Sequence, residues 1–165
     1  MSFWYALHVA SNTERQVVGR LAAAGVEGYY PHLLAKSRDQ RREVERRFFP
    51  GYVFARFDLA NRTPVLQTPH VIRILGWTHD QPAIIPDTEI QAVRLMTQAA
   101  VAVAAHPFLP AGTRVVIARG PLQGLAGFVV ESKKGLRVVV SVMMLARSIA
   151  AEVDLTDLDV TGRAA

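Results

Sequence analysis

The chain has 165 residues, of which half are hydrophobic and a fifth are charged. This composition excludes wholesale disorder, and the length fits one domain or two small ones. The chain has no cysteine, which excludes disulfides and thiolate metal sites, and its net charge of +5 is too weakly basic for a protein anchored mainly on nucleic acid.

No targeting or membrane segment is expected. The N-terminus lacks a basic region before its apolar run and contains His8, so it does not resemble a signal peptide. The longest uncharged stretch, residues 95–113, is interrupted by Gln98 and by two prolines, Pro107 and Pro110, whereas a spanning helix is continuously apolar over about 20 residues. We therefore expect a soluble, cytoplasmic protein.

The first elements in the chain are a strand and a helix. Residues 3–9 are rich in aromatic and β-branched side chains, which predicts a strand. Ser11 and Glu14 have the spacing of a capping box, and apolar residues then recur at helical spacing until Gly25. The pattern predicts a helix of about 13 residues, followed by a second strand at 28–35.

A charged segment and an aromatic strand come next. Residues 36–47 contain a single apolar side chain, Val44, so they predict a solvated hairpin or mobile loop. After Pro50 and Gly51 the residues alternate between two sets, which predicts a strand with two different faces. One set is Tyr52, Phe54 and Arg56, and the other is Val53, Ala55 and Phe57.

The rest of the chain divides into a mixed part and an all-β part. A short helix at 61–68, strands at 71–77 and 83–85 and a helix beginning at Asp87 complete the first part. A linker rich in proline separates it from short β-branched runs at 114–118, 127–131, 136–143 and 151–155. These runs predict a small barrel or sandwich, and their strong preference for strand argues against a helical alternative. The predicted boundaries are 1–104 for the first domain, 105–111 for the linker and 112–165 for the second domain.

Several segments, in the right order, resemble the NusG family of transcription factors. The glycine-containing loop between strands at 120–127 resembles the KOW motif, in which Gly120, Gly124 and Gly127 allow positive φ and close backbone approach. Further matches to the family are Trp4-Tyr5 and the segments 48–54, 69–76, 82–89, 138–141 and 147–154. Details such as the Pro-Ala-Ile-Ile-Pro run at 82–86 are similar to the specialised RfaH-like branch.

The resemblance implies an α+β fold. The first domain would be an NGN domain, with an antiparallel sheet and flanking helices, and the second an SH3-like five-stranded β-barrel of the KOW type. It also implies a non-enzymatic transcription elongation factor that binds RNA polymerase and modulates pausing, termination or antitermination. A monomer without cofactor or metal is expected.

An uncovered aromatic face is predicted to bind the clamp helices of RNA polymerase. Because Val53, Ala55 and Phe57 already supply a buried face, Tyr52 and Phe54 are expected on a side of the sheet without helix cover. By resemblance, the clamp-helix site comprises Tyr5, His8, Phe49, Pro50, Tyr52, Phe54 and Ile85. The alternative is that these side chains simply belong to the core.

The resemblance implies three further contacts. Thr63, Gln67 and Thr68 are candidates for the opposite pincer of the polymerase, and Arg15, Arg20 and Arg73 for the non-template DNA strand. Met144, Leu145 and Arg147 are candidates for a barrel partner, either Rho or a ribosomal small-subunit protein. Leu145 replaces the phenylalanine of the family, which leaves the partner open, and surface or core roles are the alternatives for every residue in these sets.

Enzymatic activity is not expected. The five histidines lack metal-ligand spacing, and neither a nucleophile elbow nor a phosphate loop occurs. The acidic cluster Asp154, Asp157 and Asp159 has no basic or amide partner in the sequence pattern. The alternative function is a ribosome- or RNA-binding KOW protein, in which the barrel grips RNA.

Overall fold

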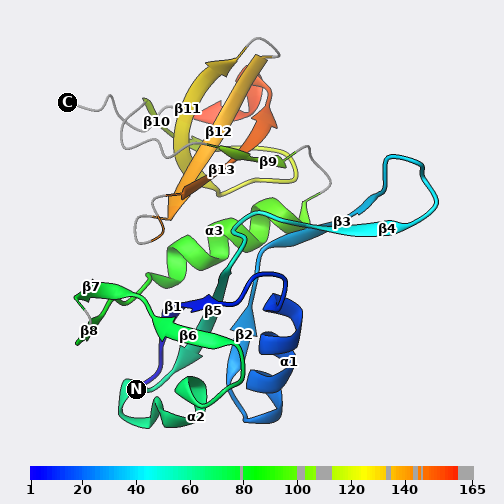
Figure 1. The fold of residues 1–165 in the computed structure, drawn as a ribbon. Helices are drawn as coiled ribbons and strands as arrows, with labels where there is room; N and C mark the ends of the chain where they lie inside the picture. The colour runs from blue at the N-terminus through cyan, green and yellow to red at the C-terminus, as the bar shows by residue number, and fades with distance from the viewer. Residues whose placement is uncertain are drawn as a thin grey trace. The chain divides into compact units, whose positions relative to one another are not determined.

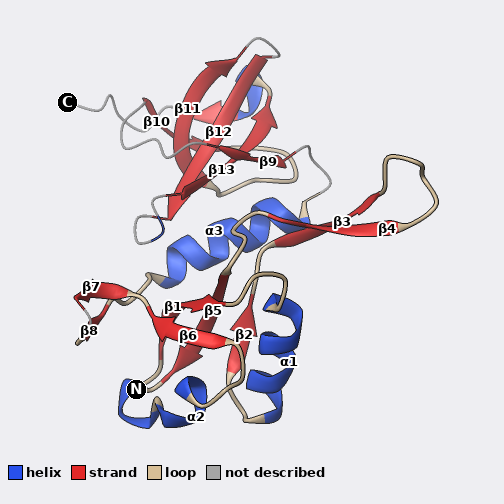
Figure 2. Cartoon of the chain, in the orientation of Figure 1, coloured by secondary structure: helices blue, strands red, loops and turns tan. Residues whose placement is uncertain are grey.

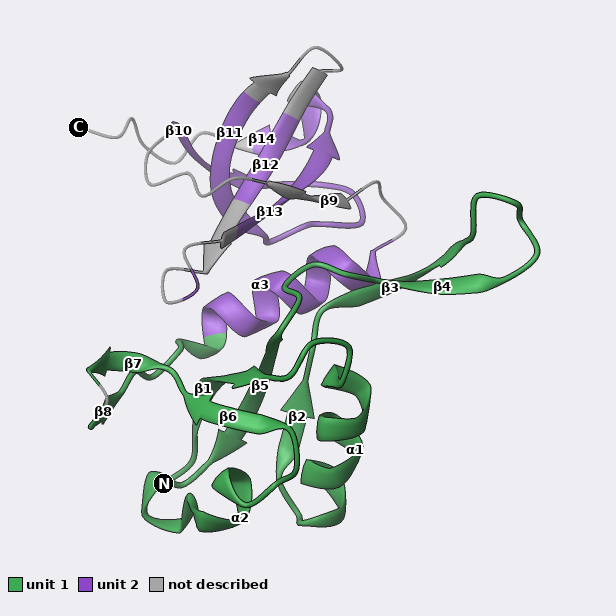
Figure 3. Ribbon diagram, viewed as in Figure 1, with its two compact units in different colours: residues 1–87 green, residues 88–165 purple. Residues whose placement is uncertain are grey.

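The computed structural model describes residues 1–78, 80–99, 103–106, 113–132, 135–142, 145 and 147–159. The chain divides into two compact units, Met1–Asp87 and Thr88–Ala165 (Figure 3). Within the described ranges, no helix has the length and apolar character that a membrane crossing requires.

An antiparallel four-stranded sheet is the centre of the first unit (Figure 1). The strands lie in the order β2-β5-β1-β6, so β2 and β6 form the edges. Their bounds are Glu27–Tyr29 for β2, Tyr52–Phe57 for β5, Phe3–Val9 for β1 and Val71–Ile74 for β6. The central pair, β1 and β5, joins the two aromatic segments that the sequence singled out.

Two helices cover one face of this sheet. Helix α1 (Glu14–Ala23) contributes Val17 and Leu21 to the core, and the single-turn helix α2 (Thr63–Leu66) contributes Val65. These side chains are fully buried against the odd-numbered residues of β1 and β5. A 3-10 turn, η1 (Leu59–Asn61), leads into α2.

The start of α1 differs from the predicted capping box. Thr13 is the residue that precedes the helix; its hydroxyl donates to the carbonyl of Ala10, and its side chain accepts no capping hydrogen bond from a helix amide. Glu14 is buried and accepts from the backbone amide of Gly51. The capping-box prediction is wrong because a contact distant in sequence takes the Glu14 carboxylate. The predicted stop is confirmed, since Gly25 follows the helix with a φ of 76°.

Two hairpins extend from the sheet of the first unit (Figure 2). The predicted second strand is broken at Pro31 into β2 and β3 (His32–Lys36), and β3 pairs with β4 (Glu43–Arg47) as the predicted solvated hairpin. The other hairpin is formed by β7 (Gly76–Thr78) and β8 (Gln81–Pro82).

The second unit contains helix α3 (Asp87–Gln98), whose first residue belongs to the first unit, and a six-stranded antiparallel sheet. Five strands follow the order β14-β10-β11-β12-β13, as the predicted barrel requires. Their bounds are Thr113–Ile117 for β10, Ala126–Ser132 for β11, Gly135–Val142 for β12, Arg147–Val153 for β13 and Leu158–Asp159 for β14. A 3-10 turn, η3 (Leu155–Asp157), precedes β14.

The sixth strand, β9 (Val103–His106), was not predicted. It pairs antiparallel with β13, and Ala105 and His106 lie opposite Ile149 and Ser148. The segment expected to begin the linker therefore starts within a strand, and its residues 107–111 lie outside the described residues. The prolines that follow this segment predicted a linker, but the apolar residues before the prolines can pair with an open sheet edge.

Candidate functional site

The two faces of the first-unit sheet hold different residues of the predicted clamp-helix site. Side chains alternate between faces along a strand, so Tyr5 and His8, three residues apart on β1, lie on opposite faces. Tyr5 is 3% exposed and belongs to the core beneath α1 and α2, where its ring centroid lies 4.8 Å from that of Phe57. The prediction that Tyr5 is a surface contact is therefore wrong.

The opposite face carries the even-numbered residues, and much of it is buried too. Phe54 is fully buried, and Phe49 and Ile85 are each 2% exposed. The rings contact one another, because Phe49 meets Phe54 edge-on at 6.1 Å and Tyr29 stacks on Phe54 at 6.2 Å. The expectation of a fully open aromatic face is wrong for Phe49, Phe54 and Ile85, because these side chains pack into an apolar layer.

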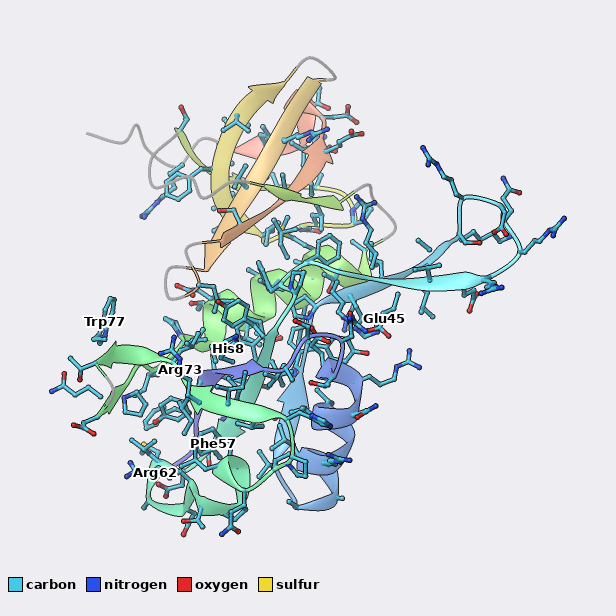
Figure 4. All side chains as sticks on the ribbon, in the orientation of Figure 1. His8, Glu45, Phe57, Arg62, Arg73 and Trp77 are labelled. Atoms are coloured by element: carbon cyan, nitrogen blue, oxygen red, sulfur yellow. The ribbon has the colours of Figure 1, made fainter. Side chains whose placement is uncertain are left out.

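Part of this face remains accessible. Tyr52 and His8 are half-buried and lie side by side on β5 and β1, with ring centroids 5.6 Å apart, and Pro50 is exposed. His8 also lies opposite Arg73 of β6, so Tyr52, His8 and Arg73 form a row across three strands (Figure 4). Cross-strand partners project to the same side of a sheet. This row and Pro50 form an accessible surface on this face.

A buried carboxylate holds the turn that precedes Tyr52. Glu14 is 1% exposed, its Oε1 accepts from the Gly51 amide at 2.8 Å, and its Oε2 lies 3.3 Å from Nε of Arg47. Gly51 has a φ of 84°, a conformation that favours glycine. This role of Glu14 could not be predicted from the sequence, since nothing in the local pattern links positions 14, 47 and 51.

The base of the β3–β4 hairpin is tied to α1 by further charges. Glu45 lies 2.9 Å from Arg15 and 3.2 Å from Arg47. Burial, the largest single influence, raises the pKa of Glu45, but the Tyr30 hydrogen bond and the charges of Arg47, Arg15 and His32 outweigh it and lower the pKa below its usual 4.5. Arg47 in addition donates to Asn12 at 2.7 Å.

The three arginines predicted to contact DNA are not brought together. Arg15 and Arg20 lie on α1, which packs against β2 and β5. Arg73 lies on β6, the edge strand at the other end of the sheet. Arg15 and Arg20 can share one contact, and Arg73 belongs with His8 and Tyr52.

The chain was compared with known proteins. The family model described as transcription termination factor nusG matches residues 2–94, more than half of the chain. The chain belongs to the NusG family. Members of this family are transcription factors and not enzymes, and this chain is likewise a transcription factor.

Curated NusG relatives match along almost the whole chain. The transcription termination/antitermination protein NusG of Pseudomonas aeruginosa is 29% identical, over 94% of this chain and 97% of its own length. The protein of that name from Vibrio vulnificus is 30% identical, over 90% and 91% respectively. The solved structure of Thermotoga maritima NusG matches with a TM-score of 0.54 at 20% identity, covering 98% of both chains, which supports the fold alone.

Of the three polar residues of the α2 segment that were predicted to contact the polymerase, two are accessible on the surface of this NusG-family chain. Thr63 and Gln67 are exposed. Thr68 is 7% exposed, and its hydroxyl donates to the carbonyl of Pro64 at 2.8 Å. Thr68 therefore closes the helix end, as the structural alternative proposed, and is not accessible to a partner.

The barrel loops are described only in part. Leu145 is 8% exposed, which agrees with the core alternative rather than with a docking contact. Met144 lies outside the described residues, and Arg147 is placed only as the first residue of β13. The described residues contain no group of histidine and carboxylate side chains that could hold a metal ion.

The glycines of the KOW-like loop have the predicted conformations. Gly120 and Gly124 have φ values of 89° and 86°. A Cβ added to Gly127 would lie 2.7 Å from the carbonyl oxygen of Val139, so a side chain cannot fit there without a backbone shift. The loop depends on positive φ at two positions and on close approach at the third.

Proposed function

We propose that this NusG-family chain acts on transcription termination or antitermination in the cytoplasm by binding elongating RNA polymerase through its first unit. The observation that carries the proposal is the accessible row of Tyr52, His8 and Arg73 beside exposed Pro50. It supplies rings with polar edges on a rigid sheet, which suits the apolar stripe of a partner helix. The clamp helices of the polymerase are the proposed occupant.

The buried rings have a supporting role in this proposal. Phe54, stacked by Tyr29 and met edge-on by Phe49, lies two residues from Tyr52 on the same face of β5. Glu14 accepts a hydrogen bond from the Gly51 amide and so holds the turn that precedes Tyr52. Because these contacts limit the movement of Tyr52, little conformational entropy is lost when a helix binds.

The test is a titration of the full chain with a fragment that contains the polymerase clamp helices. Tyr52→Ala is expected to weaken binding about tenfold, the size of a moderate hot-spot loss. Tyr52→Phe keeps the ring and is the matched control, and far-UV circular dichroism checks the fold of both. Unchanged affinity of Tyr52→Ala would contradict the proposal, and strong RNA binding without polymerase affinity would favour the alternative of an RNA-binding KOW protein.

We further propose that α2 contacts the opposite pincer of the polymerase through exposed Thr63 and Gln67. A chain that touches both sides of the cleft restrains clamp opening, which suppresses pausing without any bond chemistry. Thr63→Ala with Gln67→Ala should lengthen pauses in an elongation assay while leaving clamp-fragment affinity unchanged. Pause lifetimes equal to those of the unaltered chain would remove α2 from the mechanism.

The non-template strand is proposed to pass α1. Arg20 is exposed, and the side chain of Arg15 is 68% exposed even though it lies beside Glu45. Two cations neutralise few phosphates, so the salt dependence of this contact should be shallow. Crosslinking of the strand to the elongation complex should fall in Arg20→Glu, and an unchanged yield would contradict the contact.

The barrel is proposed to recruit a second partner, either Rho or a ribosomal small-subunit protein. Support comes from the division into two units, since the polymerase contacts proposed above all lie in the first. The full chain, immobilised and exposed to purified Rho or to small ribosomal subunits, should retain one of them. Retention of neither would contradict recruitment through the barrel.

A further inference from the structure

The row across the first-unit sheet continues beyond Arg73 to an exposed tryptophan. Trp77 lies on β7, four residues after Arg73, and is 75% exposed. β6 ends at Ile74 and β7 begins at Gly76, so Trp77 follows Arg73 after a break in the strand. Figure 4 shows Arg73 and Trp77 following His8 in a line across this side of the unit.

The hairpin that carries Trp77 is closely built. A Cβ added to Gly76 would lie 2.0 Å from the carbonyl oxygen of Gln81, so β8 approaches the chain at a position where only glycine fits. The amide of Ala83 donates to the carbonyl of Leu75 at 3.1 Å, which closes the base of the hairpin. Trp77 is thus exposed on a fixed element and not on a free loop.

Arg73 differs in its surroundings from the arginines near α1. Arg15 and Arg47 are each held by carboxylates within 3.3 Å, whereas Arg73 is exposed and takes part in no ion pair with a described residue. An exposed guanidinium that forms no ion pair with a described residue is complementary to an acidic residue of a partner.

We propose that Arg73 and Trp77 extend the helix-docking site, so that the occupant is an amphipathic polymerase helix with a carboxylate facing Arg73 and an apolar face against Trp77. This rests on the proposed function. The inference moves Arg73 from the DNA contact to the protein contact, and it adds Trp77, which no motif identified.

The dimensions of the row fit a helix of moderate length. Neighbouring strands are about 4.8 Å apart and residues along a strand about 3.3 Å apart, so the surface from Tyr52 to Trp77 spans roughly 16 Å. A helix rises 1.5 Å per residue, so about 11 residues, or three turns, cover this surface. Tryptophan and arginine are the residue types most enriched among binding hot spots.

The first measurement is affinity for the clamp-helix fragment, using full-length variants. Arg73→Glu and Trp77→Ala should each weaken binding at least tenfold, whereas Arg20→Glu, a charge-matched change on α1, should leave it unchanged. Arg73→Glu should also reduce the salt dependence of binding, since one attractive charge pair is lost.

The second measurement observes Trp77 directly. The chain has two tryptophans, Trp4 with 2% exposure and Trp77 with 75%, so 5-fluorotryptophan labelling gives two ¹⁹F signals in different environments. The Trp77 signal should shift on addition of the unlabelled clamp-helix fragment, and the Trp4 signal should shift much less. Assignment comes from Trp77→Phe.

The outcomes separate the two proposals. If Tyr52→Ala weakens binding but Arg73→Glu and Trp77→Ala do not, and the Trp77 signal does not move, the extension is wrong and the clamp contact remains. If Tyr52→Ala also has no effect, the polymerase site itself is wrong. If Arg73→Glu reduces only crosslinking to the non-template strand, Arg73 is a DNA contact and the inference is overturned.

Discussion

The two ends of the first-unit sheet use arginine in opposite ways. At the α1 end, Arg15 and Arg47 lie within 3.3 Å of Glu45 and Glu14, and the charges tie a hairpin to a helix. At the β6 end, Arg62 and Arg73 are exposed and line the same cavity, which Asp80 also lines, but neither arginine forms an ion pair with a described residue. Arginines at the first end stabilise the fold, and those at the second are available to a partner.

The largest effect should come from removing the buried carboxylate at the α1 end. Glu14→Ala leaves the Gly51 amide without its acceptor and Arg47 with one carboxylate fewer, which should lower the free energy of unfolding by about 3 kcal/mol. Chemical denaturation measures the loss. Glu14→Gln can still accept from Gly51 and should lose less, and equal losses in both variants would assign the effect to charge alone.

The next largest loss of stability is expected at the β6 end, when a glycine of the β7–β8 hairpin is replaced. Gly76→Ala places a Cβ 2.0 Å from the Gln81 carbonyl oxygen and should lower the free energy of unfolding by about 2 kcal/mol. The variant should also reduce the change in the Trp77 signal when the clamp-helix fragment binds. Gly19→Ala is the matched control, because an added Cβ there meets no atom within 4 Å and alanine favours the helix. A rise in melting temperature for Gly76→Ala would show that the hairpin is not closely built.

A smaller effect should appear in the acid range. The folded-state pKa of Glu45 is below its usual 4.5, so Glu45 contributes stability that is complete above the unfolded-state pKa and is lost as the pH falls through the folded-state pKa. Unfolding measured from pH 7 to pH 3 should therefore show a shallower acid decline in Glu45→Gln. Parallel curves for the two proteins would mean that the Arg15 and Arg47 pairs add nothing.

The smallest effect on stability is expected for the arginines of the β6 end. Arg62→Ala and Arg73→Ala should change the free energy of unfolding by less than about 0.5 kcal/mol, as substitutions of exposed side chains that form no ion pair with the described residues usually do. Thermal unfolding of these variants and of Arg47→Ala measures the two losses of stability side by side. A loss as large as that of Arg47→Ala would place these arginines among the structural ones.

Much of the fold could be predicted from the sequence because the periodicity of apolar residues and the turn residues specify where strands, helices and turns lie. The strand β1, helix α1, the solvated hairpin and four of the barrel strands follow from local patterns, and Gly120 and Gly124 from their turn chemistry, whereas a fifth barrel strand was expected only from the family resemblance. Strand β9 could not be predicted in this way, since its pairing depends on an edge of β13 that forms more than 40 residues later in the chain.

The site was predicted less well, for two physical reasons. Alternation along β1 already separates Tyr5 from His8, so that error could have been avoided by counting positions. By contrast, the burial of Phe54 and the pairing of Arg47 with Glu14 depend on tertiary contacts that no local spacing encodes. The sequence shows which residues are arginines but not which of them a carboxylate already holds.

The pairing of β9 with β13 has a consequence for how the second unit can be isolated. A fragment beginning at residue 112 would leave the seven-residue strand β13 with a bare row of amides and carbonyls, an edge at which copies can self-associate during expression. Retaining residues 103–106 gives β13 a partner along four positions. A soluble, monomeric barrel therefore calls for a fragment that starts before Val103.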